Sequence, residues 1–128
     1  MKRITMTVTT AADGTVTADS PVRVSGEIHQ MEYVKDTASA GANAYADGVD
    51  FTITGKKTGI NLWTEANVNA SAVRAPRQPT HSQAGVASLY AAGGTGVQAR
   101  VALANDQIRI VLAQGGAAKV GTFHILVA

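Results

Sequence analysis

The stretch "ANDQIRIVLAQGGAAKVGTFHILVA" (residues 104–128) indicates the fold class of this chain. Its apolar residues alternate with other residues on both sides of a Gly-Gly-Ala-Ala loop. A period of two is typical of β-strands that bury one face. The side chains expected to point inward are Ile108, Ile110, Leu112, Phe123, Ile125 and Val127, and those expected to point outward are Thr122, His124 and Leu126. The stretch therefore predicts two well-formed strands joined by a glycine-rich loop.

The same alternation extends through most of the chain. "RITMTVTT" (residues 3–10) alternates apolar residues with threonine, and "VDFTITGKKTGINLWTE" (residues 49–65) has the pattern of a hairpin that turns at Gly-Lys-Lys-Thr-Gly. Elsewhere the apolar parity shifts, which predicts a bulge or sharp bend between Gly26 and Gln30. We therefore expect residues 1–128 to form one all-β domain, an antiparallel β-sandwich or jelly-roll-like barrel with minor helix.

Three segments fit this pattern less simply. Residues 37–48 are small and polar and predict a long loop with room for a helical turn, while residues 86–94 fit either a helical turn or a strand. Residues 95–106 predict another strand. The side chains expected on its buried face are Val97, Ala99, Val101 and Leu103.

The composition favours a domain whose surface is partly covered by a partner. The 128 residues are 45% apolar but only 16% charged, against about 25% charged in average soluble proteins. The net charge is +2, and no run of Lys or Arg is longer than two residues, so we expect no specific nucleic-acid site. With no cysteine, the chain has neither disulfides nor a thiolate metal site.

The sequence also bears on where the protein acts. The first residues alternate like a strand and lack the continuous apolar run of a signal peptide. No stretch has the length of a transmembrane helix. We therefore expect a protein made in a cytoplasm, with no membrane partner.

Catalytic and metal-binding patterns are not found in the sequence. His29, His81 and His124 lie far apart in the sequence and match no metal-ligand motif. An acid, a base and a nucleophile cannot be assembled without arbitrary choice. We therefore expect no enzyme activity, cofactor or metal, and interpret His124 as a surface or interface side chain.

The segment "RAPRQPTHS" (residues 74–82) is the strongest candidate interaction site. Proline lowers the entropy cost of ordering a segment, and arginine is favoured at protein interfaces. It predicts a stiff docking loop that leaves the sheet. A proline-guarded edge that blocks strand pairing is an equally good interpretation, and the two are compatible. The candidate residues are Arg74, Pro76, Arg77, Pro79 and His81.

A second candidate surface is a carbohydrate site around Trp63. Carbohydrate sites commonly use an exposed aromatic ring with polar neighbours, and Asn61 and Asn67 lie nearby in the sequence. The parity of the strand leaves Trp63 on the side opposite Leu62, which predicts an outward-facing ring. A receptor- or glycan-binding module is therefore the alternative to an assembly protein.

Several motifs in the last two-thirds of the chain resemble those of one group of proteins. The segment ending in Thr80 and His81 precedes "LYAAGG" (residues 89–94), an "LAND" strand begins at Leu103, and "GTFHILV" (residues 121–127) closes the pattern. Together with Arg77, they resemble small cysteine-free proteins encoded among the virion genes of tailed bacteriophages and prophages.

The resemblance implies a virion structural protein without catalytic residues, made in the cytoplasm of a host bacterium. Its partners would be further copies of itself and the major capsid or neck and tail subunits. The expected function is to decorate or cement a capsid, or to join a neck, in many copies. A tail-associated place remains the alternative.

Overall fold

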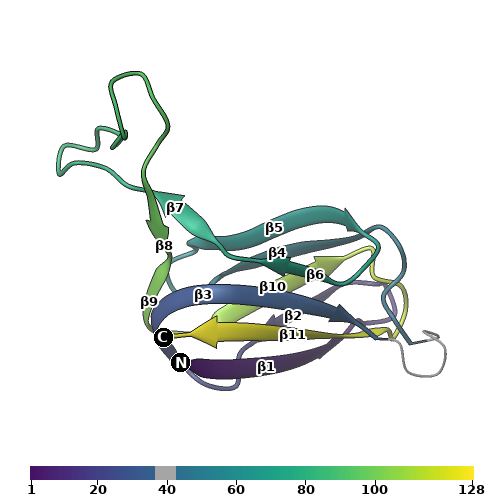
Figure 1. The fold of residues 1–128 in the computed structure, drawn as a ribbon. Coiled ribbons are helices and arrows are strands. Elements are labelled where there is room, and N and C mark those ends of the chain that lie inside the picture. Colours follow the sequence, from purple (N-terminus) through teal and green to yellow (C-terminus); the bar gives the residue numbers. More distant parts are fainter. Residues whose placement is uncertain (37–42) are drawn as a thin grey trace.

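The computed structural model describes residues 1–36 and 43–128, and in this part of the chain it contains eleven β-strands and no helix (Figure 1). The all-β prediction is confirmed, whereas the minor helix is not found among these residues. The strands are β1 (Lys2–Thr9), β2 (Val16–Asp19), β3 (Val24–Lys35), β4 (Val49–Gly55), β5 (Asn61–Val68), β6 (Ala72–Arg74), β7 (Arg77–Pro79), β8 (Gln98–Arg100), β9 (Ala102–Asp106), β10 (Ile108–Ala113) and β11 (Val120–Val127).

Two antiparallel sheets form the sandwich. The first sheet has the order β1-β11-β3-β6, and β9 pairs with the beginning of β3. The second has the order β2-β10-β4-β5, and β7 pairs with β8 in a separate ribbon. This arrangement agrees with the predicted antiparallel sandwich or barrel.

The closing stretch of sequence supplies an inner strand to each sheet. Strand β10 lies between β2 and β4 in the second sheet, and β11 lies between β1 and β3 in the first. The chain therefore crosses from one layer to the other between these strands. All six residues predicted to point inward are at most 5% exposed. Their alternation holds the two layers together because each strand buries one side against the other sheet.

Strand β3 contains the predicted bend. Its pairing registers shift between Val24 and Gly26, and again where Leu126 and Val127 pair with Gln30 and Ile28. Gly26 has a φ of 129°, and a Cβ atom there would lie 2.1 Å from a backbone oxygen at the end of β11. Only glycine fits this position.

An aromatic cluster fills the space between the sheets. The ring centroid of Phe51 lies 4.8 Å from Tyr33, 5.6 Å from Trp63 and 5.2 Å from Phe123. All three pairs meet edge to face, an arrangement that adds about 0.5–1.5 kcal/mol per pair to area burial. Tyr45 stacks on the other side of Tyr33. These few rings compensate for the small side chains elsewhere in the core.

Three local predictions need correction or restriction. The single strand predicted in residues 95–106 is divided at Val101 into β8 and β9, and Ala99 is exposed instead of buried. Residues 86–94 contain turns and isolated bridges, neither a helical turn nor a strand. Part of the predicted loop 37–48 lies outside the described residues, and the rest forms turns with one isolated bridge at Ala44.

Candidate functional site

A long arm projects from one end of the sandwich (Figure 1). We define the arm as residues 77–100, which comprise β7, β8 and the segment between them. The ribbon has three residue pairs, from Arg77 with Arg100 to Pro79 with Gln98. The structure thus places Arg77, Pro79 and His81 on an excursion from the sheets, as the two prolines predict.

Beyond the ribbon, the main chain of Ser88 divides the arm into two lobes, residues 81–87 and residues 89–96, each closed by an isolated bridge. The Ser88 amide donates to the carbonyl of Thr80 at 2.9 Å, and the Val97 amide donates to the carbonyl of Ser88 at 2.9 Å. The Thr80 amide and hydroxyl both donate to the Val97 carbonyl, at 3.0 and 2.9 Å. Three distant segments therefore meet at one junction of main-chain hydrogen bonds.

The lobes have no hydrophobic core of their own. Val86 is 66%, Leu89 is 44% and Tyr90 is 76% exposed. A two-stranded ribbon without a packed face is only marginally stable in water. The lobes therefore expose apolar side chains that the described part of the chain does not cover.

The arm is held firmly at its base. Pro76 and Val101, which flank it on either side, are both buried. Arg100 lies 3.8 Å from Glu27 on β3 as an ion pair, and Arg77 donates to the carbonyl of Pro76 at 2.9 Å. The buried residues Pro76 and Val101 anchor both strands of the ribbon at the sandwich.

Carboxylates are absent from a long stretch that includes the arm. Between Glu65 and Asp106 the sequence contains neither Asp nor Glu. The charged residues of the arm are therefore the two arginines of its ribbon, with His81 as a further titratable group. The fixed charges of the arm are therefore positive, and they lie in its ribbon.

Trp63 and Arg74 form a separate closed cluster on the side of the sandwich. Trp63 is only 6% exposed, so the prediction of an outward-facing ring is wrong. Its indole Nε1 donates to Glu65 at 3.2 Å, and the guanidinium of Arg74 lies 5.7 Å from the ring centroid. Arg74 also forms an ion pair with Glu65. With Trp63 covered, this cluster offers no exposed aromatic platform to a sugar.

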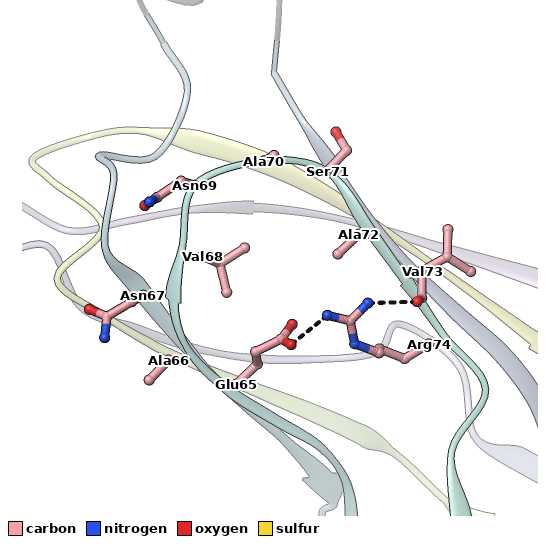
Figure 2. A pocket seen from close by; sticks show the side chains of 10 residues that line it. All are labelled: Glu65, Ala66, Asn67, Val68, Asn69, Ala70, Ser71, Ala72, Val73 and Arg74. Atoms are coloured by element: carbon pink, nitrogen blue, oxygen red, sulfur yellow. Dashed lines mark hydrogen bonds and ion pairs between the residues drawn. The ribbon is translucent and has the colours of Figure 1, made fainter.

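A hollow of about 460 Å³ lies beside this cluster, at the connection between β5 and β6. Figure 2 shows the ion pair of Glu65 and Arg74 at one side of it. The rest of the lining consists of small or polar side chains. The lining residues are Glu65, Ala66, Asn67, Val68, Asn69, Ala70, Ser71, Ala72, Val73 and Arg74.

His124 lies on the outer face of the first sheet, as its parity predicts. Its ring is half-buried, and its Nδ1 atom lies 3.0 Å from the hydroxyl of Thr5 on the neighbouring strand. On the other side, the register pairs His124 with Glu32. The structure therefore does not bring His124 together with the arm.

Sequence reasoning missed the exposed apolar residues of the lobes. Leu89 and Tyr90 stand in "LYAAGG", which has no clear period. An aromatic residue followed by a glycine pair, outside any alternating pattern, was the available signal. Among residues 1–36 and 43–128, no group of three or more His, Asp or Glu residues could hold a metal. No helix in that part could cross a membrane.

The fold and the arm thus come from the structure of this chain alone. No protein-family model matches the chain, and no curated protein matches its sequence.

Proposed function

We propose that this chain is a non-enzymatic structural protein of a tailed-phage virion. It binds in many copies to the capsid surface, as a decoration or cement protein, or to the neck. The observation that carries this proposal is the arm, whose exposed apolar lobes extend beyond the core of their own chain (Figure 1). A projecting ribbon of this kind suits contact with neighbouring subunits.

The energetics favour many copies over a single contact. Burying the side chains of Val86, Leu89 and Tyr90 on a partner would contribute about 1.5–3 kcal/mol each. Association itself costs about 4–15 kcal/mol in lost motion. One arm contact is therefore marginal, whereas repeated contacts in a symmetric assembly gain strength from effective concentration.

The outer face of the second sheet supports the same proposal. One row across its four strands consists of Thr17, Val111, Thr52 and Thr64, with no charge. Val111 is 38% exposed in the middle of this row. A neutral row of short side chains can pack closely on another protein without a large desolvation cost. The motifs that resemble virion proteins point to the same class.

The test uses particles of the phage or prophage that encodes the chain, produced without its gene. Purified wild-type protein should co-sediment with these particles and saturate at a fixed number of copies. The double variant Leu89→Ser, Tyr90→Ser should bind at least tenfold more weakly, because it removes apolar contacts of the arm. Val22→Ser, at an apolar residue that is 40% exposed outside the arm, is the matched control. Wild-type protein that neither co-sediments nor occurs in native particles would refute the proposal.

A further inference from the structure

The charges of this protein are separated along the sandwich. We call the end from which the arm projects the arm end, and the opposite end, with residues 10–15, 43–48, 69–71 and 114–119, the loop end (Figure 1). The loop end is one connected surface, because Ala46 donates to Gly115 at 3.0 Å and Gly115 donates to Gly14 at 2.9 Å.

Cations exceed carboxylates at the arm end. Lys56 and Arg109 pair with Asp19, and Arg100 pairs with Glu27. The remaining cations form no ion pair within the described ranges. These unpaired cations are Lys2, Arg3, Arg23, Lys57 and Arg77.

Carboxylates exceed cations at the loop end. Lys35 contacts Asp47 at 3.0 Å and is one of two lysines there. The six residues that the structure does not describe carry no charge in the sequence. The carboxylates at or next to this end are Asp13, Asp36, Asp47 and Asp50, and the lysines are Lys35 and Lys119.

The hollow between β5 and β6 opens beside the loop end. Asn69 in its lining accepts a hydrogen bond from the amide of Gly48 at 2.7 Å, and the Asn67 amide donates to Asp50 at 3.0 Å. Lys35 joins Asp47 to the recess, because its Nζ atom donates both to Asp47 and to the carbonyl of Asn69, each at 3.0 Å. Asp47 and Asp50 therefore lie next to a recess of small side chains. Its volume of about 460 Å³ is within the range of sites that enclose small molecules and leaves room for one aromatic side chain.

We propose that the arm of one copy docks on the loop end of a second copy, with Tyr90 in the hollow between β5 and β6. The arginines of the arm then approach the end with excess carboxylates, and an exposed tyrosine gains a recess of small side chains with polar atoms for its hydroxyl. Because donor and acceptor surfaces differ, the contact is head to tail. Such a contact produces a closed ring or an open stack of copies.

This inference names a partner for the arm on which the proposed function rests, but it is tested on the purified protein alone. We use two blocked variants. The donor-blocked variant carries Leu89→Ser and Tyr90→Ser. The acceptor-blocked variant carries Ala70→Trp, which fills the hollow, and Asp47→Lys, which reverses a charge at its edge. The control is Val22→Ser, at an exposed apolar residue outside the arm and outside the loop end.

Sedimentation velocity and native mass spectrometry should give a defined pattern. Wild-type protein and the control form species larger than a dimer, whereas each blocked variant alone is a monomer. An equimolar mixture of the two blocked variants forms a one-to-one dimer, because one keeps its acceptor and the other its arm. Raising the salt from about 0.05 M to about 0.5 M weakens this dimer several-fold, since screening reduces the attraction between the ends.

Other outcomes overturn the inference. A monomeric wild-type protein, a blocked variant that assembles like wild type, or a mixture that forms no dimer would each contradict it. Cooperative thermal unfolding and an unchanged far-ultraviolet circular dichroism spectrum show that the variants are folded, and Asp47→Lys alone serves as a milder acceptor variant. Protein that binds particles but never itself refutes this inference and leaves the proposed function standing. Self-association without particle binding does the reverse.

Discussion

Replacing Gly121 by alanine tests the packing that holds the loop end to the first sheet. A Cβ atom at Gly121 would lie 2.3 Å from Cε2 and 2.8 Å from Cζ of Tyr45, and 3.0 Å from Cε1 of Tyr33. The Tyr45 ring cannot simply turn away, because its hydroxyl donates to the buried carbonyl of Val8 and its ring stacks on Tyr33. Gly121→Ala therefore forces the tyrosine out of its site.

The expected cost follows from three contributions. Overpacking a filled core costs about 1–3 kcal/mol, and losing the bond from Tyr45 to Val8 costs about 1–3 kcal/mol. The smaller unfolded-state entropy of alanine offsets about 0.4–1 kcal/mol. We expect Gly121→Ala to lower the free energy of unfolding by roughly 2–4 kcal/mol.

A double-mutant cycle separates this reasoning from a general effect on the strand. Tyr45→Ala alone should cost about 3–5 kcal/mol. Once the ring is removed, Gly121→Ala meets little obstruction, so the double variant should be about as stable as Tyr45→Ala. The coupling free energy between the two sites should then be about 2–4 kcal/mol.

Urea unfolding followed by the fluorescence of Trp63, at one protein concentration, measures all four proteins. The control is Gly96→Ala on the arm, where an added Cβ meets no atom within 4 Å, and it should change stability by less than about 0.5 kcal/mol. If the costs of Gly121→Ala and Tyr45→Ala simply add, the ring is not the obstacle and the packing argument fails.

Two further predictions concern pH. The ion pairs from Arg109 and Lys56 hold the pKa of Asp19 well below its usual range, so Asp19→Asn should lower the free energy of unfolding by about 1 kcal/mol at pH 7. Urea unfolding should show this difference shrinking as the pH falls below about 4, because the carboxylate becomes protonated. A difference that stays constant with pH would contradict this prediction. Burial raises the pKa of Tyr33 to about 12, whereas an unfolded tyrosine ionises near pH 10. Stability should therefore fall as the pH rises from about 10 towards 12. The fall should be less steep in Tyr33→Phe than in wild-type protein, and equal slopes in the two proteins would argue against this role.

The fold class could be predicted because strand alternation is a local property. Ile110 and Phe123 face the core since each lies in a strand whose partners continue on both sides. The same reasoning failed at Trp63. The register between β4 and β5 shifts between Ile53 and Thr54, so that Leu62 is an extra residue and both Leu62 and Trp63 are buried. A bulge depends on the partner strand, which alternation within one strand does not reveal.

The arm exposed a second limit of sequence reasoning. Ala99 continues the alternation of Val101, yet β8 has left the sheet at that point and pairs only with β7. Burial requires an opposing layer, and its presence depends on the distant parts of the chain. Pro79 could be placed outside the sheets, because proline restricts its own backbone. The exposed position of Tyr90 depends on distant parts of the chain and could not be predicted.

The hydrogen-bonded junction at Ser88 makes the lobe of residues 89–96 a suitable site for inserting a peptide. The amide of Tyr90 donates to the carbonyl of Thr95 at 3.0 Å, so residues 91–94 leave and rejoin the arm at adjoining points. A peptide inserted between Gly93 and Gly94 would be displayed without strain on the ribbon or the sandwich. If the lobe enters a neighbouring copy, such an insert would also act as a cap that ends growth of the array.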